Sequence, residues 1–317
     1  MKILLYNSHP PYSFDLIRGL PGAYFYHVGW ANFLRPDPPN TTIVPDIKEV
    51  EGERFDVAIT DHDDFWFSDI FKTLKVAKKI HIFHCQNCND GDPKVQAQKE
   101  KVCQAVDAIV TPSEHKMMTY RELSFKYPFH VIPLGVNGED YPIGSRDSGY
   151  IGIVHNVLHE FPEMSPWWKK VCEILGDRKK VLIGQGNKDL GYHKCDIWIP
   201  SGWDEYRKMI GSLNVFINCV PSEIAGYTPR EVMASGVPVI SAIMTDFSEC
   251  GFNGWNMMVY LGSTGQGVAW LADTAKYVFD HPDYAAGIGH WGRETILRKY
   301  PLEIFQEMWR GLIYDQA

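Results

Sequence analysis

Short apolar runs alternate with helical patterns along the whole chain, and this alternation is the feature that most constrains the fold. In the first half, the strand-like runs are Lys2–Tyr6, Tyr24–Val28, Phe55–Thr60, Ile80–His84, Ala108–Thr111 and His130–Pro133. In the second half, they are Tyr150–Val154, Lys180–Gly184, Ile197–Pro200, Val215–Asn218, Val237–Ala242 and Met257–Leu261. Strands that alternate with helices are typical of parallel sheets flanked by helices. The sequence therefore predicts an α/β fold with two doubly wound, Rossmann-like domains.

The length of 317 residues is enough for two domains of roughly 150 residues each. Residues 135–144 are rich in Gly and Pro, as a linker between domains should be. Apolar periodicity predicts two helices over 284–313 with a break at Tyr300-Pro301, and the last helix is expected to return to the first domain. The expected domains are residues 1–143, residues 144–298 and a terminal helix over residues 299–317.

The charge balance excludes a general attraction to polyanions. Lys and Arg total 31 against 39 for Asp and Glu, a formal net charge of -8, so an anionic ligand needs a local site. The chain begins with a short strand and has neither a signal-peptide core nor an apolar run of about 18 residues. The seven scattered cysteines suit a reducing compartment. We therefore expect a cytoplasmic protein with no integral membrane segment.

Residues 65–79 form an aromatic and basic stretch that is expected to be helical. Such a helix could touch a membrane. However, the apolar residues fit the stripe of an ordinary helix that faces the core. We favour the core interpretation for the stripe Phe67, Ile70, Phe71, Leu74 and Ala77.

A Cys-x-x-Cys pair, Cys85 and Cys88, follows His81 and His84 and could be half of a zinc site. The chain contains no second pair at a zinc-finger spacing. We therefore interpret these cysteines as loop thiols and expect no metal.

The second domain contains a strand, loop, helix and strand unit around two carboxylates, Glu223 and Glu231, which lie eight positions apart. Strand 215–218 precedes them, Pro229 suits a first helical turn, and Ser235-Gly236 ends the helix. A loop that leads into a helix N-terminus directs backbone N–H groups at an anion. The spacing alone leaves open whether the carboxylates are a hydrolytic acid and base or only a helix-dipole partner and a surface residue.

The segment Pro221–Ser241 resembles the sugar-nucleotide signature of glycosyltransferase family 4, which comprises retaining enzymes of the GT-B fold. Further pieces that resemble the family, in the same order, are Val110–Glu114, Val131–Asn137, Leu182–Gly186, Asn214–Ser222 and Gly254–Asn256. The resemblance is close over residues 133–259 and looser before them. It implies two Rossmann-like domains that face each other across a cleft, with a C-terminal helix that braces the first.

The resemblance also implies roles for particular residues. Glu231 would accept hydrogen bonds from the donor ribose, Glu223 would lie near the hydroxyls of the donor sugar, and His84 would lie at the catalytic cleft. The implied catalytic residues are His84 and Glu223. The implied donor-binding residues are Glu231, Gly226, Tyr227, Thr228, Pro229, Arg230, His155, Ser8 and Gly184. The amides at the helix start would hold the diphosphate.

Two departures from the family pattern concern the diphosphate. No Arg or Lys lies between Arg146 and Lys169, where the family normally supplies both. The possible substitutes are His155, His159, Lys169, Lys170 and Arg230. The loop after the first strand, where the family usually has glycines, is expected to hold Ser8, His9, Tyr12 and Ser13.

The resemblance implies a metal-independent retaining transferase that moves a sugar from a nucleotide diphosphate sugar to an acceptor hydroxyl. No cofactor is expected besides this donor substrate. Three alternatives stay open: a non-catalytic nucleotide-sugar-binding module, a sugar-nucleotide epimerase of the same fold, and a transferase that acts on modified DNA bases. The acidic total disfavours the last of these, because nucleic-acid binding depends on positive charge.

Overall fold

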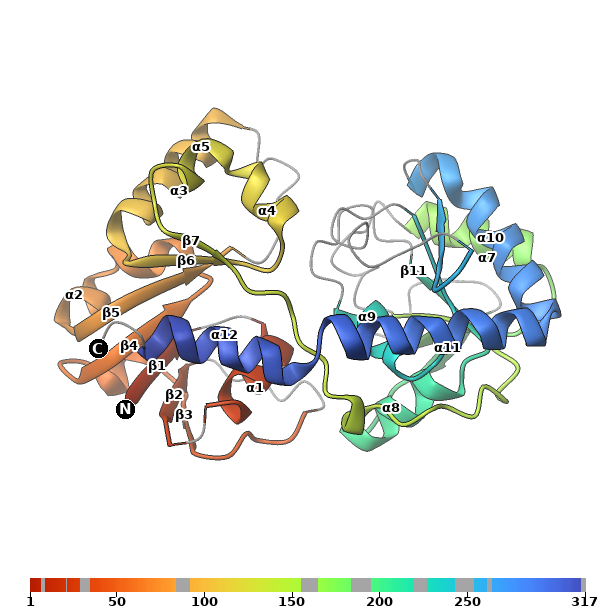
Figure 1. Ribbon diagram of the computed structural model, residues 1–317, viewed down its shortest axis with the longest axis horizontal. Coiled ribbons are helices and arrows are strands. Elements are labelled where there is room, and N and C mark those ends of the chain that lie inside the picture. The colour runs from red at the N-terminus through yellow and green to blue at the C-terminus, as the bar shows by residue number, and fades with distance from the viewer. Residues whose placement is uncertain are drawn as a thin grey trace. The chain divides into compact units, whose positions relative to one another are not determined.

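The structure is a computed structural model, and it divides into two compact units. The first unit is Met1–Gly135 with Leu302–Ala317, and the second is Val136–Pro301 (Figure 1). The residues that the structure describes are 1–6, 9–20, 22–28, 35–83, 92–154, 165–183, 195–218, 227–242, 254–260 and 264–314.

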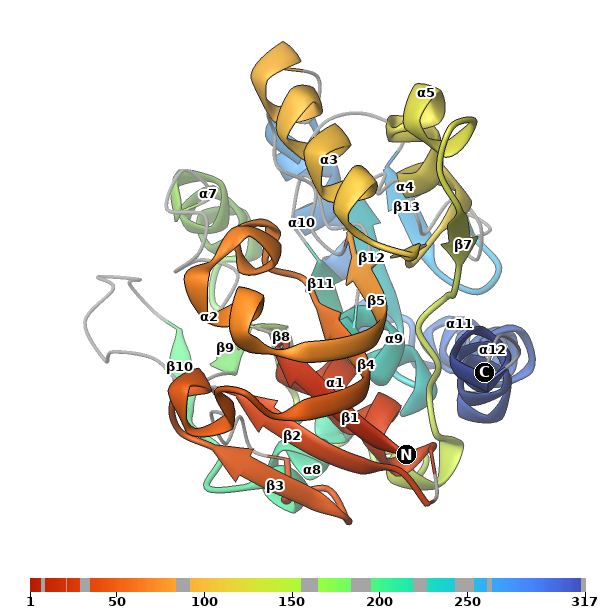
Figure 2. The ribbon, with the colours of Figure 1, turned by 90° about the vertical axis from the view of Figure 1, so that its left-hand side faces the viewer.

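The described part of the first unit contains one parallel sheet of seven strands in the order β3-β2-β1-β4-β5-β6-β7 (Figure 2). The strands are β1 (Lys2–Tyr6), β2 (Tyr24–Val28), β3 (Thr41–Val44), β4 (Arg54–Thr60), β5 (Lys75–Ile82), β6 (Ala108–Thr111) and β7 (Phe129–Val131). The strand order reverses between β1 and β4, as in a doubly wound sheet.

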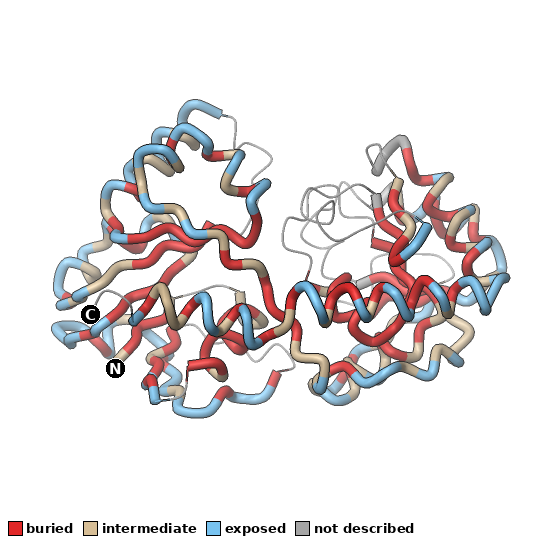
Figure 3. Tube along the Cα trace, viewed as in Figure 1, coloured by how far each residue is buried: buried red, intermediate tan, exposed pale blue. Residues whose placement is uncertain are grey.

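The first unit also contains helices and short 3-10 turns. They are α1 (Pro10–Arg18), η1 (Ile47–Val50), η2 (Asp63–Phe67), α2 (Asp69–Thr73), α3 (Pro93–Ala105), α4 (Glu114–Thr119), α5 (Arg121–Ser124) and the C-terminal α12 (Leu302–Tyr314). One core cluster joins strands β1, β4 and β6 to η2, α3 and α5. The central strands are almost wholly buried, while the outer turns and helix faces are exposed (Figure 3).

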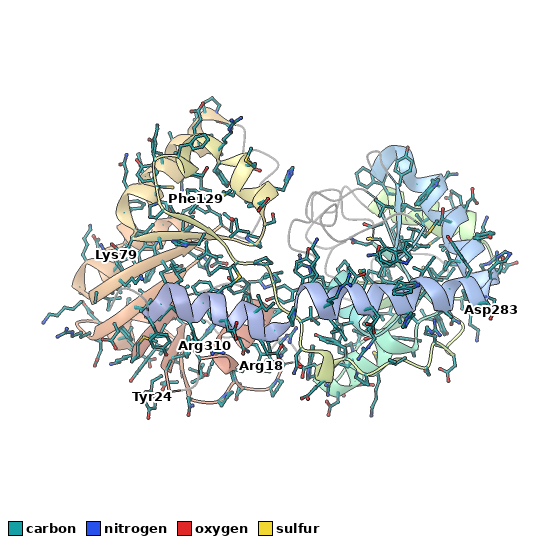
Figure 4. The ribbon with its side chains drawn as sticks, in the orientation of Figure 1. Arg18, Tyr24, Lys79, Phe129, Asp283 and Arg310 are labelled. Atoms are coloured by element: carbon teal, nitrogen blue, oxygen red, sulfur yellow. The ribbon has the colours of Figure 1, made fainter. Side chains whose placement is uncertain are left out.

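Helix α12 completes the first unit by packing on α1. Trp309 donates its indole N–H to the hydroxyl of Tyr12 at 3.0 Å. The ring of Phe305 lies edge-on to the ring of Tyr12, with the two centroids 5.3 Å apart. All three side chains are buried. Arg18 on α1 and Arg310 on α12 are labelled in Figure 4. The terminal helix is therefore part of the first unit's core.

The described part of the second unit contains a parallel sheet of six strands in the order β10-β9-β8-β11-β12-β13. The strands are β8 (Ile151–Val154), β9 (Lys180–Ile183), β10 (Asp196–Trp198), β11 (Val215–Asn218), β12 (Val239–Ala242) and β13 (Met258–Tyr260). The helices are η3 (Gly138–Asp140), α7 (Ser165–Leu175), α8 (Trp203–Ser212), α9 (Tyr227–Ala234), α10 (Thr264–Asp280) and α11 (Pro282–Lys299). Helices α7 and α10 share a core with strands β8, β9, β11 and β12.

The expected linker packs as part of the second unit. Val136 forms an isolated bridge with Pro301 and donates its N–H to the carbonyl of Tyr300 at 2.8 Å. Gly144 donates its N–H to the carbonyl of Ser235 at 2.9 Å. The division accordingly falls at 135/136 and 301/302, while the sequence places the boundaries at 143/144 and 298/299.

Two local predictions are wrong, one for residues 65–79 and one for Tyr12 and Ser13. Residues 65–79 do not form one helix, because η2 and α2 end at Thr73 and β5 begins at Lys75. Phe65 and Trp66 are buried there, whereas Phe67, which was expected to face the core, is 47% exposed.

Tyr12 and Ser13 do not lie in a loop, because α1 begins at Pro10. Proline suits a first helical turn, where its missing N–H costs no hydrogen bond. The two helices expected over 284–313 are confirmed as α11 and α12, with the break at Tyr300 and Pro301. Within the described residues, no helix combines the length and apolarity that a membrane span needs.

His27 on β2 predicts a loss of stability in acid. Its side chain is fully buried, and burial lowers its pKa to about 4 from an ordinary value near 6.5. The unfolded chain therefore binds the proton first, and stability that is present above pH 6.5 is lost as the pH falls toward 4. This residue alone should cost about 3 kcal/mol of unfolding free energy between pH 7 and pH 4.

Urea unfolding at pH 7 and pH 4 measures this loss for the wild type and for His27→Gln. The variant cannot take up the proton, so its loss over the same interval should be smaller by about 3 kcal/mol. Equal losses in both proteins would show that His27 does not cause the acid sensitivity.

Candidate functional site

The strand order of the second sheet indicates that the candidate site lies at the carboxyl ends of its central strands. The order reverses between β8 and β11, because β9 and β10 extend to one side and β12 and β13 to the other. Ligands of doubly wound sheets bind beyond the carboxyl ends of the strands at such a switch point. Here β8 ends at Val154 and β11 ends at Asn218.

Polar side chains occur where the central strands end at this edge. Asn218 on β11 is paired in register with Ser241 on β12. The Asn218 amide donates to the Ser241 hydroxyl at 3.3 Å, and both residues are buried. The carboxyl end of the sheet therefore contains hydrogen-bonding groups within an apolar core.

Helix α9 begins at Tyr227 and leads from this edge to β12. The first N–H groups of any helix lack acceptors within that helix, and in α9 these groups include those of Tyr227 and Thr228. Pro229 has no N–H and occupies the first turn. Such a helix start favours an anion both by hydrogen bonding and by the helix dipole.

The carboxylate of Glu231 on α9 is buried and held by two tyrosines. The Tyr141 hydroxyl donates to Oε1 at 2.7 Å and the Tyr206 hydroxyl donates to Oε2 at 2.8 Å, while Glu231 is only 4% exposed. Trp203 stacks on Tyr206 at 5.6 Å and meets the ring of Tyr141 edge-on at 5.8 Å. A carboxylate only accepts hydrogen bonds, so the two tyrosine hydroxyls, one on each oxygen, orient it.

Tyr141 is itself fixed through its backbone. The Arg293 guanidinium on α11 donates to the carbonyl of Tyr141 and to that of Ala234 at the end of α9. Arg207 on α8 donates to the carbonyl of Asp140 at 2.7 Å. The chain around η3 is therefore bound to helices α8, α9 and α11, which places the Tyr141 hydroxyl on Glu231.

Arg230, expected at the donor diphosphate, packs against the end of α11. It is 2% exposed, and its guanidinium carbon lies 4.3 Å from the ring centre of Tyr300. Lys169 and Lys170, two suggested substitutes, lie exposed on α7, and Lys170 pairs with Glu173 at 3.1 Å. A donor-binding role for Arg230 stays a prediction.

The structure brings part of the predicted site together. Helix α9 carries the predicted residues Tyr227, Thr228, Pro229, Arg230 and Glu231. The predicted residues that lie outside the described residues are His84, Glu223, Gly226, His155, Ser8 and Gly184. The sequence reasoning missed Tyr141 and Tyr206, and no motif around either tyrosine marks it as a partner of Glu231.

A buried histidine lies near the carboxyl end of β5 in the first unit. The Trp66 indole donates to Nδ1 of His81 at 2.9 Å, so the proton of the neutral ring is on Nε2, which lies 3.2 Å from Oδ1 of Asp63. Burial lowers the pKa of His81. Asp63 also accepts from Lys99 at 2.8 Å.

Both nitrogens of His81 are therefore directed at protein partners. The other candidate zinc ligands, His84, Cys85 and Cys88, lie outside the described residues, so the interpretation of these cysteines as loop thiols stays a prediction. In the part of the chain that the structure describes, no three His, Cys, Asp or Glu side chains are grouped to hold a metal.

Comparison with known proteins identifies the architecture. The sequence matches no family model and no curated protein. Among solved structures, sucrose-phosphate synthase from Thermosynechococcus elongatus is 14% identical and superposes with a TM-score of 0.72, covering 100% of this chain and 99% of that chain. HepE from Anabaena in complex with UDP-glucose is 11% identical, with a TM-score of 0.70 over 98% of this chain and 99% of that chain.

The chain has the GT-B fold. A glycosyltransferase from Rickettsia africae, 11% identical with a TM-score of 0.67, covers 100% of this chain and 99% of its own. These matches span both sheets, which confirms the fold class expected from the alternation of strands and helices. In this GT-B chain the Glu231 carboxylate and the start of α9 lie in the second Rossmann-like domain.

Proposed function

We propose that this GT-B protein is a retaining, metal-independent glycosyltransferase of the family 4 type that uses a UDP-sugar donor. The observation that carries the proposal is the buried Glu231 carboxylate on α9, oriented by two tyrosine hydroxyls beside the switch point of the second sheet. Structures of similar fold support a uridine donor, since HepE has been solved with UDP and with UDP-glucose. TarM, 16% identical over 81% of this chain and 55% of its own, has been solved with UDP.

In this proposal Glu231 accepts hydrogen bonds from the hydroxyls of the donor ribose. The N–H groups of Gly226, Tyr227 and Thr228 hold the diphosphate, where negative charge grows as the glycosidic bond breaks. Glu223 orients the hydroxyls of the donor sugar. The tyrosines that donate hydrogen bonds to Glu231 fix the position of its side chain before the donor binds. This reduces the conformational entropy that is lost on binding.

The transfer proceeds on one face of the donor sugar. The bond between the anomeric carbon and the diphosphate oxygen breaks, and the acceptor oxygen bonds to the same carbon from the face that the diphosphate leaves. The acceptor proton passes to an oxygen of the departing diphosphate, so no protein base is required. His84 lies beside the reacting sugar in this proposal and helps to exclude water, which would otherwise hydrolyse the donor.

Nucleotide binding provides the test. UDP at 100 times its dissociation constant should stabilise the protein by about 2.7 kcal/mol and raise the thermal midpoint, while CMP should not. Incubation of the protein with UDP-glucose should release UDP slowly by hydrolysis, at a rate that EDTA leaves unchanged. If none of UDP, GDP, ADP and TDP shifts the midpoint, the donor-site assignment fails.

A second candidate function is supported by the absence of Arg and Lys between Arg146 and Lys169. Removal of one preorganised donor to the leaving group commonly costs about a hundredfold in rate. The chain would then bind a nucleotide sugar as a sensor or partner subunit without turning it over. Thermal stabilisation by UDP-sugars, with neither hydrolysis nor transfer to any acceptor in a sugar panel, would identify this function.

A further inference from the structure

We propose that Cys172 and Cys195 in the second unit form a dithiol site that a small-molecule disulfide, such as oxidised glutathione, converts to an intramolecular disulfide. The bond would tie helix α7 to the edge strand β10. The inference goes beyond the proposed function and does not depend on it. The same two side chains can be tested whether or not the protein transfers a sugar.

The two sulfur atoms are already in contact. Cys172 is on α7 and Cys195 directly precedes β10, and their Sγ atoms lie 3.2 Å apart. A disulfide bond is about 2.05 Å long, so the sulfurs need to approach by only about 1.2 Å. Cys172 belongs to the core cluster of the second unit, and Cys195 packs against that cluster. Core packing therefore holds the pair together before any oxidant arrives.

The surroundings give the two thiols different reactivity. Cys195 is partly exposed, and a hydrogen bond with Cys172 lowers its pKa, helped by the charge of Lys180 and by the Trp168 indole against the opposing effect of burial. Cys172 is only 8% exposed. Because the thiolate is the nucleophile, the accessible Cys195 attacks the oxidant first and Cys172 resolves the intermediate.

The exchange balances in two steps. The Cys195 thiolate attacks one sulfur of oxidised glutathione, forms a mixed disulfide and releases one glutathione thiolate. The Cys172 thiolate then attacks the Cys195 sulfur, forms the internal disulfide and releases the second glutathione thiolate. Two electrons pass from the cysteines to glutathione, and the two thiol protons of the protein end on the two released glutathione molecules.

The bond would stabilise a weak edge of the sheet. Strand β10 has three residues and is paired on one side with β9. Tyr150 also holds this strand, because its hydroxyl donates to the carboxylate of Asp196 and its ring lies 4.8 Å from that of Trp198. Covalent attachment to α7 removes the open conformations in which β10 separates from its neighbours. Oxidation should therefore protect the β10 amides from hydrogen exchange.

Cys103 in the first unit offers an internal control. It is 1% exposed, and burial raises its pKa to about 12. A thiol of this kind is neither accessible nor ionised at neutral pH, so it should not react with glutathione.

The test is a titration of the full chain with mixtures of oxidised and reduced glutathione, followed by alkylation and peptide mapping. We expect the peptides of Cys172 and Cys195 to appear cross-linked, with the mass of two hydrogens lost, while Cys103 remains alkylated. Exchange of the 196–198 amides should slow by at least about tenfold on oxidation and recover with a reductant. An uncross-linked pair under fully oxidising mixtures, or either cysteine linked to a different one, would refute the proposal.

Single variants test the order of attack. Cys172→Ala should leave glutathione attached to Cys195 as a lasting mixed disulfide. Cys195→Ala should slow glutathione attachment at Cys172 by at least about tenfold relative to Cys195 in the first variant. Equal rates at the two cysteines would overturn the assignment of Cys195 as the attacking thiol. If a variant does not fold, the cross-link map of the wild type still decides whether the dithiol exists.

Discussion

Replacement of Glu231 with Gln is expected to raise the KM for a UDP-sugar by about 10- to 100-fold and to change kcat much less. The neutral amide has one acceptor oxygen instead of two charged ones, and a hydrogen bond to a charged group contributes about 1.5 to 3 kcal/mol. The ribose is bound equally in the ground state and in the transition state. The loss of binding energy therefore weakens both states alike, which raises KM and leaves kcat nearly unchanged. Initial rates of UDP release at several donor concentrations measure both constants.

The two tyrosines give matched controls for this variant. Tyr206→Phe and Tyr141→Phe each remove one hydroxyl from the Glu231 carboxylate but leave its charge, so each should raise KM less than Glu231→Gln does. Glu231→Ala leaves two buried hydroxyls without their acceptor and should lower the unfolding free energy by about 1 to 3 kcal/mol. If Glu231→Gln destabilises the protein as much as Ala does and leaves KM unchanged, Glu231 only holds the two tyrosines.

Apolar runs located most strands because both sheets are buried and parallel. Runs such as Ala108–Thr111 and Val215–Asn218 are buried at every residue, which is the pattern of a central strand covered on both faces. Strand β3 was missed. Two of its four residues, Thr42 and Ile43, are exposed, and it lies at the edge of the first sheet beside β2. An edge strand of this length has no apolar periodicity to detect.

The error over residues 65–79 has a tertiary cause. Lys75, Val76 and Ala77 with Lys78 and Lys79 could continue a helical stripe as well as form a strand. In the structure these residues belong to β5, which pairs with β4 from Arg54 opposite Lys75 to Thr60 opposite His81. Pairing with β4 decides the conformation of these residues, and β4 lies outside the stretch of sequence that suggests a helix.

The position of Glu231 on a helix was predictable from its neighbours in sequence. The signature placed Glu231 on a helix that follows the central strand, and α9 has that position. Its partners come from far along the chain, since Tyr141 lies 90 residues before Glu231 and Tyr206 lies 25 before it. Tyr141 also falls in a stretch whose Gly and Pro content suggests a linker. Only the folded chain brings these hydroxyls to the carboxylate.

Replacement of Trp309 with Ala is expected to lower the unfolding free energy of the first unit by about 3 to 5 kcal/mol. The ring is fully buried between α12 and the body of the unit, and its N–H donates to Tyr12 at 3.0 Å. The truncation opens a cavity under α12 and removes a hydrogen bond from a buried hydroxyl. Urea unfolding followed by circular dichroism measures the change, and hydrogen exchange at residues 302–314 should accelerate most.

Two further tryptophan variants test whether the loss of stability comes from the burial of Trp309 or would follow the loss of any large ring. Trp309→Phe retains most of the apolar contact and should cost less than half as much as Trp309→Ala. Trp291→Ala on α11 removes a side chain that is 43% exposed and should change stability by less than about 1 kcal/mol. If Trp309→Ala lowers the unfolding free energy no more than Trp291→Ala does, the terminal helix does not brace the first unit. Loss of a buried ring from a helix that contributes to a core must destabilise the protein more than loss of an exposed side chain does.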